Sequence, residues 1–305
     1  MKQIVFLDGQ YVEKSKAKIT VFDHGLLYGD GVFEGIRLYN GCIFKLHEHI
    51  ERLFLSARYI MLNIPMTRED LIEATAETVR RNGLYESGYI RLVVTRGEGT
   101  LGLAPWLCPK PSVFIIATTI KLYPDEVYEK GLMLVTAATT RNRVETVNPR
   151  IKSLNYLNNI LARIEAHNAG AEEALMLDHN GYVIECTADN IFIVRGKKIV
   201  TVPVYMGALK GITRDCIMDL ARNRGLEVAE EPFTRFEIVA ADECFLTGTA
   251  AEAVPVTRLD GRVIGSGEPG PVTKELIGAF REITSSDGVR IDGQKGSGRK
   301  GSKKR

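Results

Sequence analysis

The sequence of 305 residues has no apolar stretch approaching the roughly 20 residues that a membrane-spanning helix needs. Residues 1–8 hold one lysine and an apolar run that is too short for the core of a secretion signal. The net charge is only +2, which gives no general reason to expect nucleic acid or membrane as a partner. We therefore expect a soluble, cytoplasmic protein.

Cysteine is also scarce, because the chain has only five. Their number is odd, they are widely scattered, and no two have the spacing of zinc ligands or of a C-x-x-C redox pair. Reduced thiols in a cytosol are the simplest account, and no metal site is predicted. The five are Cys42, Cys108, Cys186, Cys216 and Cys244.

The length exceeds that at which one hydrophobic core usually keeps growing, so we expect two domains. We predict a small N-terminal domain at 1–119, a linker at 120–130, where Tyr123-Pro124-Asp125 interrupts the pattern, and a larger domain at 131–284. Residues 285–305 consist mostly of Gly, Ser, Lys and Arg and are predicted to be a disordered tail. The basic run at 295–305 could contact nucleic acid, but a solvated tail is the favoured interpretation.

Short strands alternate with amphipathic helices, which predicts an α/β architecture whose second half is rich in strands. Asn40-Gly41 predicts a hairpin turn, and Thr67 predicts the start of a helix that Asn82-Gly83 ends. Expected strands are Ile4–Leu7, 35–39, Cys42–Phe44, 89–95, 113–118 and 132–137, with hairpins at 180–181 and 196–197. Expected helices span about 47–61, 68–81, 155–169, 213–224 and 272–283.

Lys152 stands directly before an apolar helix, where its amine can point into a cleft. Most lysines are solvated surface charges, so the position alone is weak evidence. A lysine that forms a Schiff base must be a neutral amine, and partial burial of an amine favours that form. Asn155 and Tyr156 follow at once and offer hydrogen bonds to a phenolate oxygen.

Two further features are individually weak. Glu185 could cap a turn, or its anion could keep a pyridine nitrogen protonated so that the ring acts as an electron sink. Gly211-Ile212-Thr213 opens a helix and offers free N–H groups to a phosphate. The hydroxyl-rich turn at 247–251 and a bidentate cation from Arg52 could assist.

The G-x-G-x-x-G at residues 97–102 follows a predicted strand and resembles a dinucleotide fingerprint. That motif also needs a helix to begin there, and Pro105 and Pro109 disfavour one. We therefore interpret the stretch as an interdomain or active-site loop and keep a nicotinamide-dependent dehydrogenase as a remote alternative.

Taken together, the motifs resemble the class IV (fold-type IV) aminotransferases. The resemblance rests on E-x-T-x-x-N-I-F at 185–192, I-x-T at 199–201 and L-x-G-I-x-R at 209–214, and it covers about residues 1–283. Within that class, the segments 28–37, 89–91, 101–103 and 152–157 resemble branched-chain amino acid transaminases. D-amino acid transaminase and aminodeoxychorismate lyase share the Lys and Glu machinery and remain alternatives.

The resemblance implies a two-domain fold with a β-rich, barrel-like larger domain, pyridoxal 5'-phosphate at the domain interface, and a homodimer or higher homo-oligomer. Lys152 would form the Schiff base and shuttle the proton, Tyr156 would bind the phenolic oxygen, and Glu185 would bind the ring nitrogen. The phosphate would be held by Arg52, Ile212, Thr213 and Thr249. The substrate α-carboxylate would be taken by Gly248, Thr249 and Ala250 with Tyr89 and Arg37. The side-chain pocket would be lined by Phe33, with Tyr28 and Leu103 from the partner subunit.

Arg91 would bind the distal carboxylate of glutamate in the same pocket that accepts leucine, isoleucine or valine. An apolar pocket with one cation at its rim can serve both substrates, whereas a wholly apolar pocket would bury the second carboxylate unpaired. Cys186 and Ala188 stand where many branched-chain enzymes have glycine, which leaves the substrate preference open.

Overall fold

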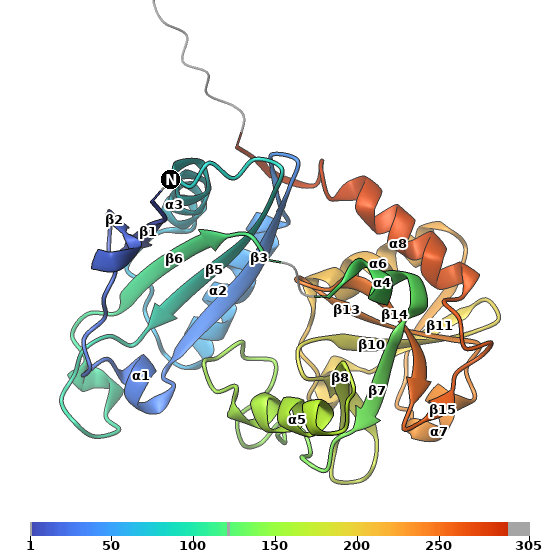
Figure 1. Ribbon diagram of the computed structural model, residues 1–305. Helices are drawn as coiled ribbons and strands as arrows, with labels where there is room; N and C mark the ends of the chain where they lie inside the picture. Colours follow the sequence, from blue (N-terminus) through green and yellow to red (C-terminus); the bar gives the residue numbers. More distant parts are fainter. Residues whose placement is uncertain (1, 121–122, 292–305) are drawn as a thin grey trace, which may run out of the picture.

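The computed structural model describes residues 2–120 and 123–291 and has two β-sheets that lie side by side (Figure 1). Within those residues, no helix is both long and apolar enough to cross a membrane. All five cysteines are buried.

The first sheet has seven strands in the order β16-β4-β3-β5-β6-β1-β2, and every neighbouring pair is antiparallel. Helices α2 (Leu46–Tyr59) and α3 (Arg68–Arg81) pack against it and enclose an aliphatic core. Its strands are β1 (Ile4–Leu7), β2 (Gln10–Glu13), β3 (Gly31–Tyr39), β4 (Cys42–Phe44), β5 (Ser87–Thr95), β6 (Ser112–Thr118) and β16 (Gly288–Arg290). The short helices η1 (Lys14–Lys16) and α1 (His24–Tyr28) lie between β2 and β3.

The second sheet has nine strands and mixed pairing, with β7 parallel to both β8 and β14. Its strands are β7 (Leu132–Thr136), β8 (Glu173–Leu177), β9 (Val183–Cys186), β10 (Asn190–Arg195), β11 (Lys198–Thr201), β12 (Glu227–Glu230), β13 (Glu243–Gly248), β14 (Glu252–Leu259) and β15 (Arg262–Val263). The associated helices are α4 (Asp125–Lys130), α5 (Leu157–Asn168), η3 (Val204–Met206), α6 (Ile212–Asn223), α7 (Arg235–Val239) and α8 (Pro271–Ile283).

The local signals in the sequence correspond to real turns and caps. Asn40 and Gly41 both have positive φ between β3 and β4, which is the backbone of a tight hairpin. Thr67 caps α3 in a capping box with Asp70. The predicted helix at 47–61 begins one residue earlier and ends two residues earlier, and β3 begins at Gly31 rather than at 35.

The prediction of a disordered tail from 285 is wrong for residues 285–291. Strand β16 pairs antiparallel with β4, and Ile291 is only 3% exposed. A Cβ on Gly288 would lie 2.1 Å from the carbonyl oxygen of Ile43, so the two backbones approach closely there. The C-terminal segment thus returns to the first sheet and joins the predicted N-terminal domain. The rest of the predicted tail, residues 292–305, lies outside the described residues.

The predicted linker 120–130 contains a helix, α4, which packs against β14; residues 121–122 lie outside the described part of the chain. The G-x-G-x-x-G segment is followed by the short 3-10 helix η2 (Pro105–Leu107) and then by β6, antiparallel to β5. A dinucleotide site needs a helix and a parallel strand at this point, so the dehydrogenase alternative is not favoured.

Candidate active site

Four of the predicted substrate residues lie on one face of the first sheet. Phe33 and Arg37 on β3 pair across from Val93 and Tyr89 on β5, and Arg91 lies between them on the same face. Arg91 stacks on the Phe33 ring with its guanidinium 4.5 Å from the ring centroid and donates to the Tyr89 hydroxyl at 2.8 Å. An apolar wall and a cation therefore meet at one point of the sheet.

Lys152 reaches this face from the loop between β7 and α5. Its Nζ lies 3.2 Å from the Tyr156 hydroxyl and 4.7 Å from the Phe33 ring centroid. Its backbone is fixed on both sides, since its carbonyl accepts from the Phe33 N–H and its N–H donates to Ser56 Oγ. The structure thus brings Lys152, Tyr156 and Phe33 together, and the lysine side chain ends between two aromatic rings.

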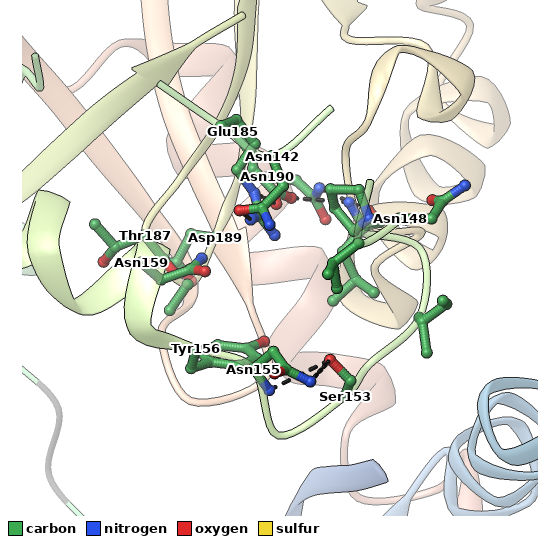
Figure 2. Close-up of a pocket in the computed structure, with 16 residues that line it drawn as sticks. Asn142, Asn148, Ser153, Asn155, Tyr156, Asn159, Glu185, Thr187, Asp189 and Asn190 are labelled. Atoms are coloured by element: carbon green, nitrogen blue, oxygen red, sulfur yellow. Dashed lines mark hydrogen bonds and ion pairs between the residues drawn. The ribbon is translucent and has the colours of Figure 1, made fainter. Parts of the chain in front are cut away.

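Glu185 lies at the other side of a pocket from Tyr156 (Figure 2). Its carboxylate is nearly buried and accepts from Arg141 Nε at 2.8 Å and from the Leu209 N–H at 2.9 Å. These two contacts hold the carboxylate at the edge of the pocket, where it could accept a hydrogen bond from a protonated ring nitrogen. Sequence reasoning did not single out Arg141, because it lies 44 residues away in a loop with several other polar residues.

Arg52 is held by a buried carboxylate that the sequence analysis also did not single out. Its Nε and Nη2 donate to the two oxygens of Glu34, each at 2.7 Å, and Nη1 donates to the Lys210 carbonyl at 2.9 Å. His49 contacts the same carboxylate through Nδ1 at 2.7 Å. This arrangement leaves one N–H on each terminal nitrogen of Arg52 free for a ligand. The alternation of side chains along β3 could have identified Glu34, because it places Glu34 on the face toward α2, opposite to Phe33.

The start of α6 is suited to an anion. The N-cap residue of this helix is Gly211, which has no side chain that could accept a hydrogen bond. The first N–H groups of the helix therefore have no side-chain acceptor from the N-cap residue, and they include those of Ile212 and Thr213. The preceding segment is fixed because Asn190 Nδ2 donates to the Leu209 carbonyl at 2.8 Å. A Cβ on Gly211 would lie 2.1 Å from Asn190 Oδ1, so the close approach requires glycine.

The predicted carboxylate-binding residues Gly248, Thr249 and Ala250 form the turn between β13 and β14. Gly248 packs against Asp189, whose Oδ1 would lie 1.8 Å from an added Cβ. Burial, with Glu173 and Glu185 nearby, raises the pKa of Asp189 to about 8. The turn therefore lies against a carboxyl group that holds a proton more readily than usual.

Tyr28 and Leu103 lie apart from the residues above, at the surface of the single chain. Leu103 is 81% exposed, and the Tyr28 hydroxyl accepts from the neighbouring Gly102 N–H at 3.0 Å. The two residues are thus neighbours, but neither faces Lys152 of its own chain in any contact between the described residues. Their predicted place in a partner's pocket stays a prediction.

The residues present fit a phosphorylated pyridine. The uncapped helix start and Arg52 suit a phosphate, Glu185 suits a ring nitrogen, and Lys152 with Tyr156 suits an aldehyde and a phenolic oxygen.

Comparison with known proteins agrees with this geometry. The family model described as amino-transferase class IV matches residues 31–259. A putative branched-chain-amino-acid aminotransferase of Methanocaldococcus jannaschii is 50% identical over 94% of this chain and 98% of its own length. The branched-chain-amino-acid aminotransferase of Escherichia coli K12 is 36% identical over 90% of this chain and 91% of its own.

Solved structures give the same result. The branched-chain amino acid aminotransferase of Escherichia coli superposes with a TM-score of 0.91 at 34% identity, covering 95% of this chain and 97% of that one. The chain belongs to the class IV aminotransferases and has their two-domain α/β fold, that of fold-type IV. It is thus a transaminase that depends on pyridoxal phosphate.

Proposed function

We propose that the protein transfers the amino group of L-leucine, L-isoleucine or L-valine to 2-oxoglutarate, in a ping-pong reaction. The relatives at 36–50% identity that carry this activity in their names support it. The observation that carries it is the contact of Arg91 with the Phe33 ring, because it joins an apolar wall to a cation. A branched aliphatic side chain can lie on the ring, and the distal carboxylate of glutamate can reach the guanidinium.

When bound, pyridoxal phosphate supplies an electron sink for negative charge at the substrate α-carbon. Lys152 would bind the cofactor covalently and, once freed as an amine, would take the proton from that carbon onto its Nζ. Glu185, which accepts from Arg141 Nε, would accept a hydrogen bond from the protonated ring nitrogen, and the Tyr156 hydroxyl, which lies beside Lys152 Nζ, would donate to the phenolic oxygen. The phosphate would be held at the start of α6 by Arg52, Ile212, Thr213 and Thr249.

The α-carboxylate is bound by the turn at 248–250 and by Tyr89, and Arg37 lies against this turn. This orientation presents the α-hydrogen to Lys152 and the side chain to Phe33. In a D-amino acid that presents its α-hydrogen to Lys152, the carboxylate and the side chain exchange places. The carboxylate would then face Phe33 and the side chain would face the turn, so the site favours L-amino acids.

We also propose that the working unit is at least a homodimer. Helix α5 exposes four apolar side chains, and Leu103 and Trp106 in the loop after β5 are more than four-fifths exposed. Segments that expose several large apolar side chains are typical of a subunit interface. The four on α5 are Leu157, Ile160, Leu161 and Ile164. A cytoplasmic location, expected from the composition, completes the proposal.

The first test is the visible spectrum of the protein incubated with pyridoxal phosphate. We expect a yellow band that bleaches with L-leucine and not with D-alanine. Lys152→Ala should bind the cofactor without the band that the covalent link produces, and should not turn over. Bleaching with D-alanine alone would overturn the substrate assignment, and a colourless wild-type protein would overturn the role of Lys152.

A further inference from the structure

The turn that joins β13 to β14 has two of its carbonyl groups held by side chains from elsewhere in the fold. Arg37 Nη1, on β3, donates to the Ala250 carbonyl at 3.1 Å. The Tyr128 hydroxyl, on α4, donates to the Ala251 carbonyl at 3.1 Å. In a trans peptide the C=O and the following N–H point in opposite directions, so holding a carbonyl also fixes where the next N–H points.

The residue that ends the turn has an unusual backbone. Glu252 has φ +63°, in the left-handed region where hairpin turns usually place glycine or asparagine. A residue with a side chain costs free energy in this conformation, so the contacts of the glutamate carboxylate must offset that cost.

Two arginines and a tyrosine lie around the Glu252 carboxylate. It lies 3.8 Å from Arg37 Nη2 and accepts from Arg281 Nε, on α8, at 3.3 Å. The half-buried Tyr39 interacts with the same carboxylate, and the Arg37 guanidinium lies 4.9 Å from the centroid of its ring. Arg37 is therefore fixed between Glu252 and Tyr39 with one N–H directed at the turn.

We propose that Glu252 is a positioning residue for the substrate α-carboxylate. It holds Arg37 against the Ala250 carbonyl and, together with Tyr128, fixes the turn at 249–251 so that its N–H groups face the substrate. The proposal rests on the role given above to this turn. In this proposal Arg37 acts on the substrate indirectly, because it holds the Ala250 carbonyl and thereby the turn.

Two arrangements can be distinguished because they predict opposite effects of one substitution. If Arg37 bound the substrate carboxylate directly, Glu252 would compete for it, and Glu252→Gln would strengthen binding. If Arg37 acts through the turn, Glu252→Gln loosens Arg37 and weakens binding.

The probe is 4-methylvalerate, which has the skeleton of leucine without the amino group; a branched-chain amino acid aminotransferase has been solved in complex with 4-methylvaleric acid. Its affinity for the cofactor-loaded protein is measured by titration calorimetry, so no turnover is involved. We expect Glu252→Gln to raise Kd by about 5- to 20-fold and Tyr128→Phe by about 2- to 10-fold, as for loss of one buried hydrogen bond. KM for L-leucine should rise in parallel while kcat stays within about 2-fold, because carboxylate binding is shared by ground state and transition state.

The matched control is Tyr205→Phe, which removes a hydroxyl from a side chain that is 69% exposed on η3 and should leave Kd unchanged. The cofactor band and Tm show whether each variant is folded, and Tyr128→Phe provides the test if Glu252→Gln is not. The proposal is overturned if Glu252→Gln binds 4-methylvalerate as tightly as wild type or more tightly. If only Tyr128→Phe folds, unchanged binding in that variant overturns it. A wild-type protein that fails to bind 4-methylvalerate would instead refute the function given to the turn.

Discussion

At Glu34, burial and ion pairing act on one carboxyl group in opposite directions. Burial alone would raise its pKa, but Arg52 and His49 more than offset this, so that the pKa is held at about 2. The carboxylate thus stays ionised over the whole physiological range. Its position beside Arg52 links the core of the first sheet to the proposed phosphate site.

We expect Glu34→Gln to lower the free energy of unfolding by about 3 kcal/mol at pH 7, because Arg52 loses its charged partner in a buried site. The folded pKa lies below the unfolded value, so the ionised form stabilises the fold above about pH 4.5, and this contribution is lost as the pH falls toward 2. Urea denaturation of the cofactor-free protein at several pH values measures both effects. His49→Gln, which removes only a neutral partner, should cost about 1 kcal/mol. Equal stability of Glu34→Gln and wild type at pH 7 would contradict the prediction.

Sequence reasoning reached the residues whose roles follow from local pattern. Lys152, Glu185 and the start of α6 each belong to a recognisable motif, and the structure brings Lys152 and Tyr156 into contact. The partners that fix these groups were not found. Glu34 and Arg141 meet Arg52 and Glu185 only through tertiary packing across 18 and 44 residues, for which a single sequence carries no periodic signal.

Among the elements, turns and caps were predictable because they depend on a few adjacent residues, as at Asn40-Gly41 and Thr67. Strand β16 was not. Its Gly-Val-Arg sequence is short and stands in a segment whose average composition is polar, and it forms only because β4 offers an unpaired edge. Val289 and Ile291 then add to the core of the first sheet.

Strand β16 allows a matched pair of truncations. Residues 292–305 contain no apolar residue other than glycine, so removing them should change the free energy of unfolding by no more than about 0.5 kcal/mol. Removing 288–305 should lower the free energy of unfolding by roughly 2 kcal/mol or more, since Ile291 is buried and its N–H donates to the Gly41 carbonyl. Chemical denaturation of both proteins measures the difference. Equal stabilities would mean that β16 adds nothing to the first sheet.

For the whole molecule, the two sheets are joined by contacts that also build the site. Arg52 reaches from α2 to the backbone before α6, and Arg37 reaches from β3 to the turn of the second sheet. Both arginines thus donate to backbone carbonyl groups in segments that connect elements of the second sheet and its helices. In the proposed site, the distance between the phosphate of the cofactor and the carboxylate of the substrate would therefore be set by how the two sheets pack.

The proposed dimer gives the last prediction. Ile160 on α5 and Phe236 on α7 are both exposed in the single chain, at 51% and 75%, but only Ile160 belongs to the apolar face of α5. Introducing a charge at the centre of an interface buries it unpaired, so Ile160→Asp should dissociate the dimer, whereas Phe236→Asp should not. Sedimentation measures the mass, and we expect wild type and Phe236→Asp at twice the mass of the chain or more.

Activity should follow the assembly, because Tyr28 and Leu103 would line the pocket of the partner subunit. We expect Ile160→Asp to lose at least about 10-fold in kcat/KM for L-leucine, since the pocket loses one of its walls and opens to water. Raising the protein concentration should restore part of the activity, as mass action requires for a weakened dimer. A wild-type protein that sediments as a fully active monomer would contradict the dimer, and an Ile160→Asp monomer with unchanged kcat/KM would show that each chain completes its own pocket.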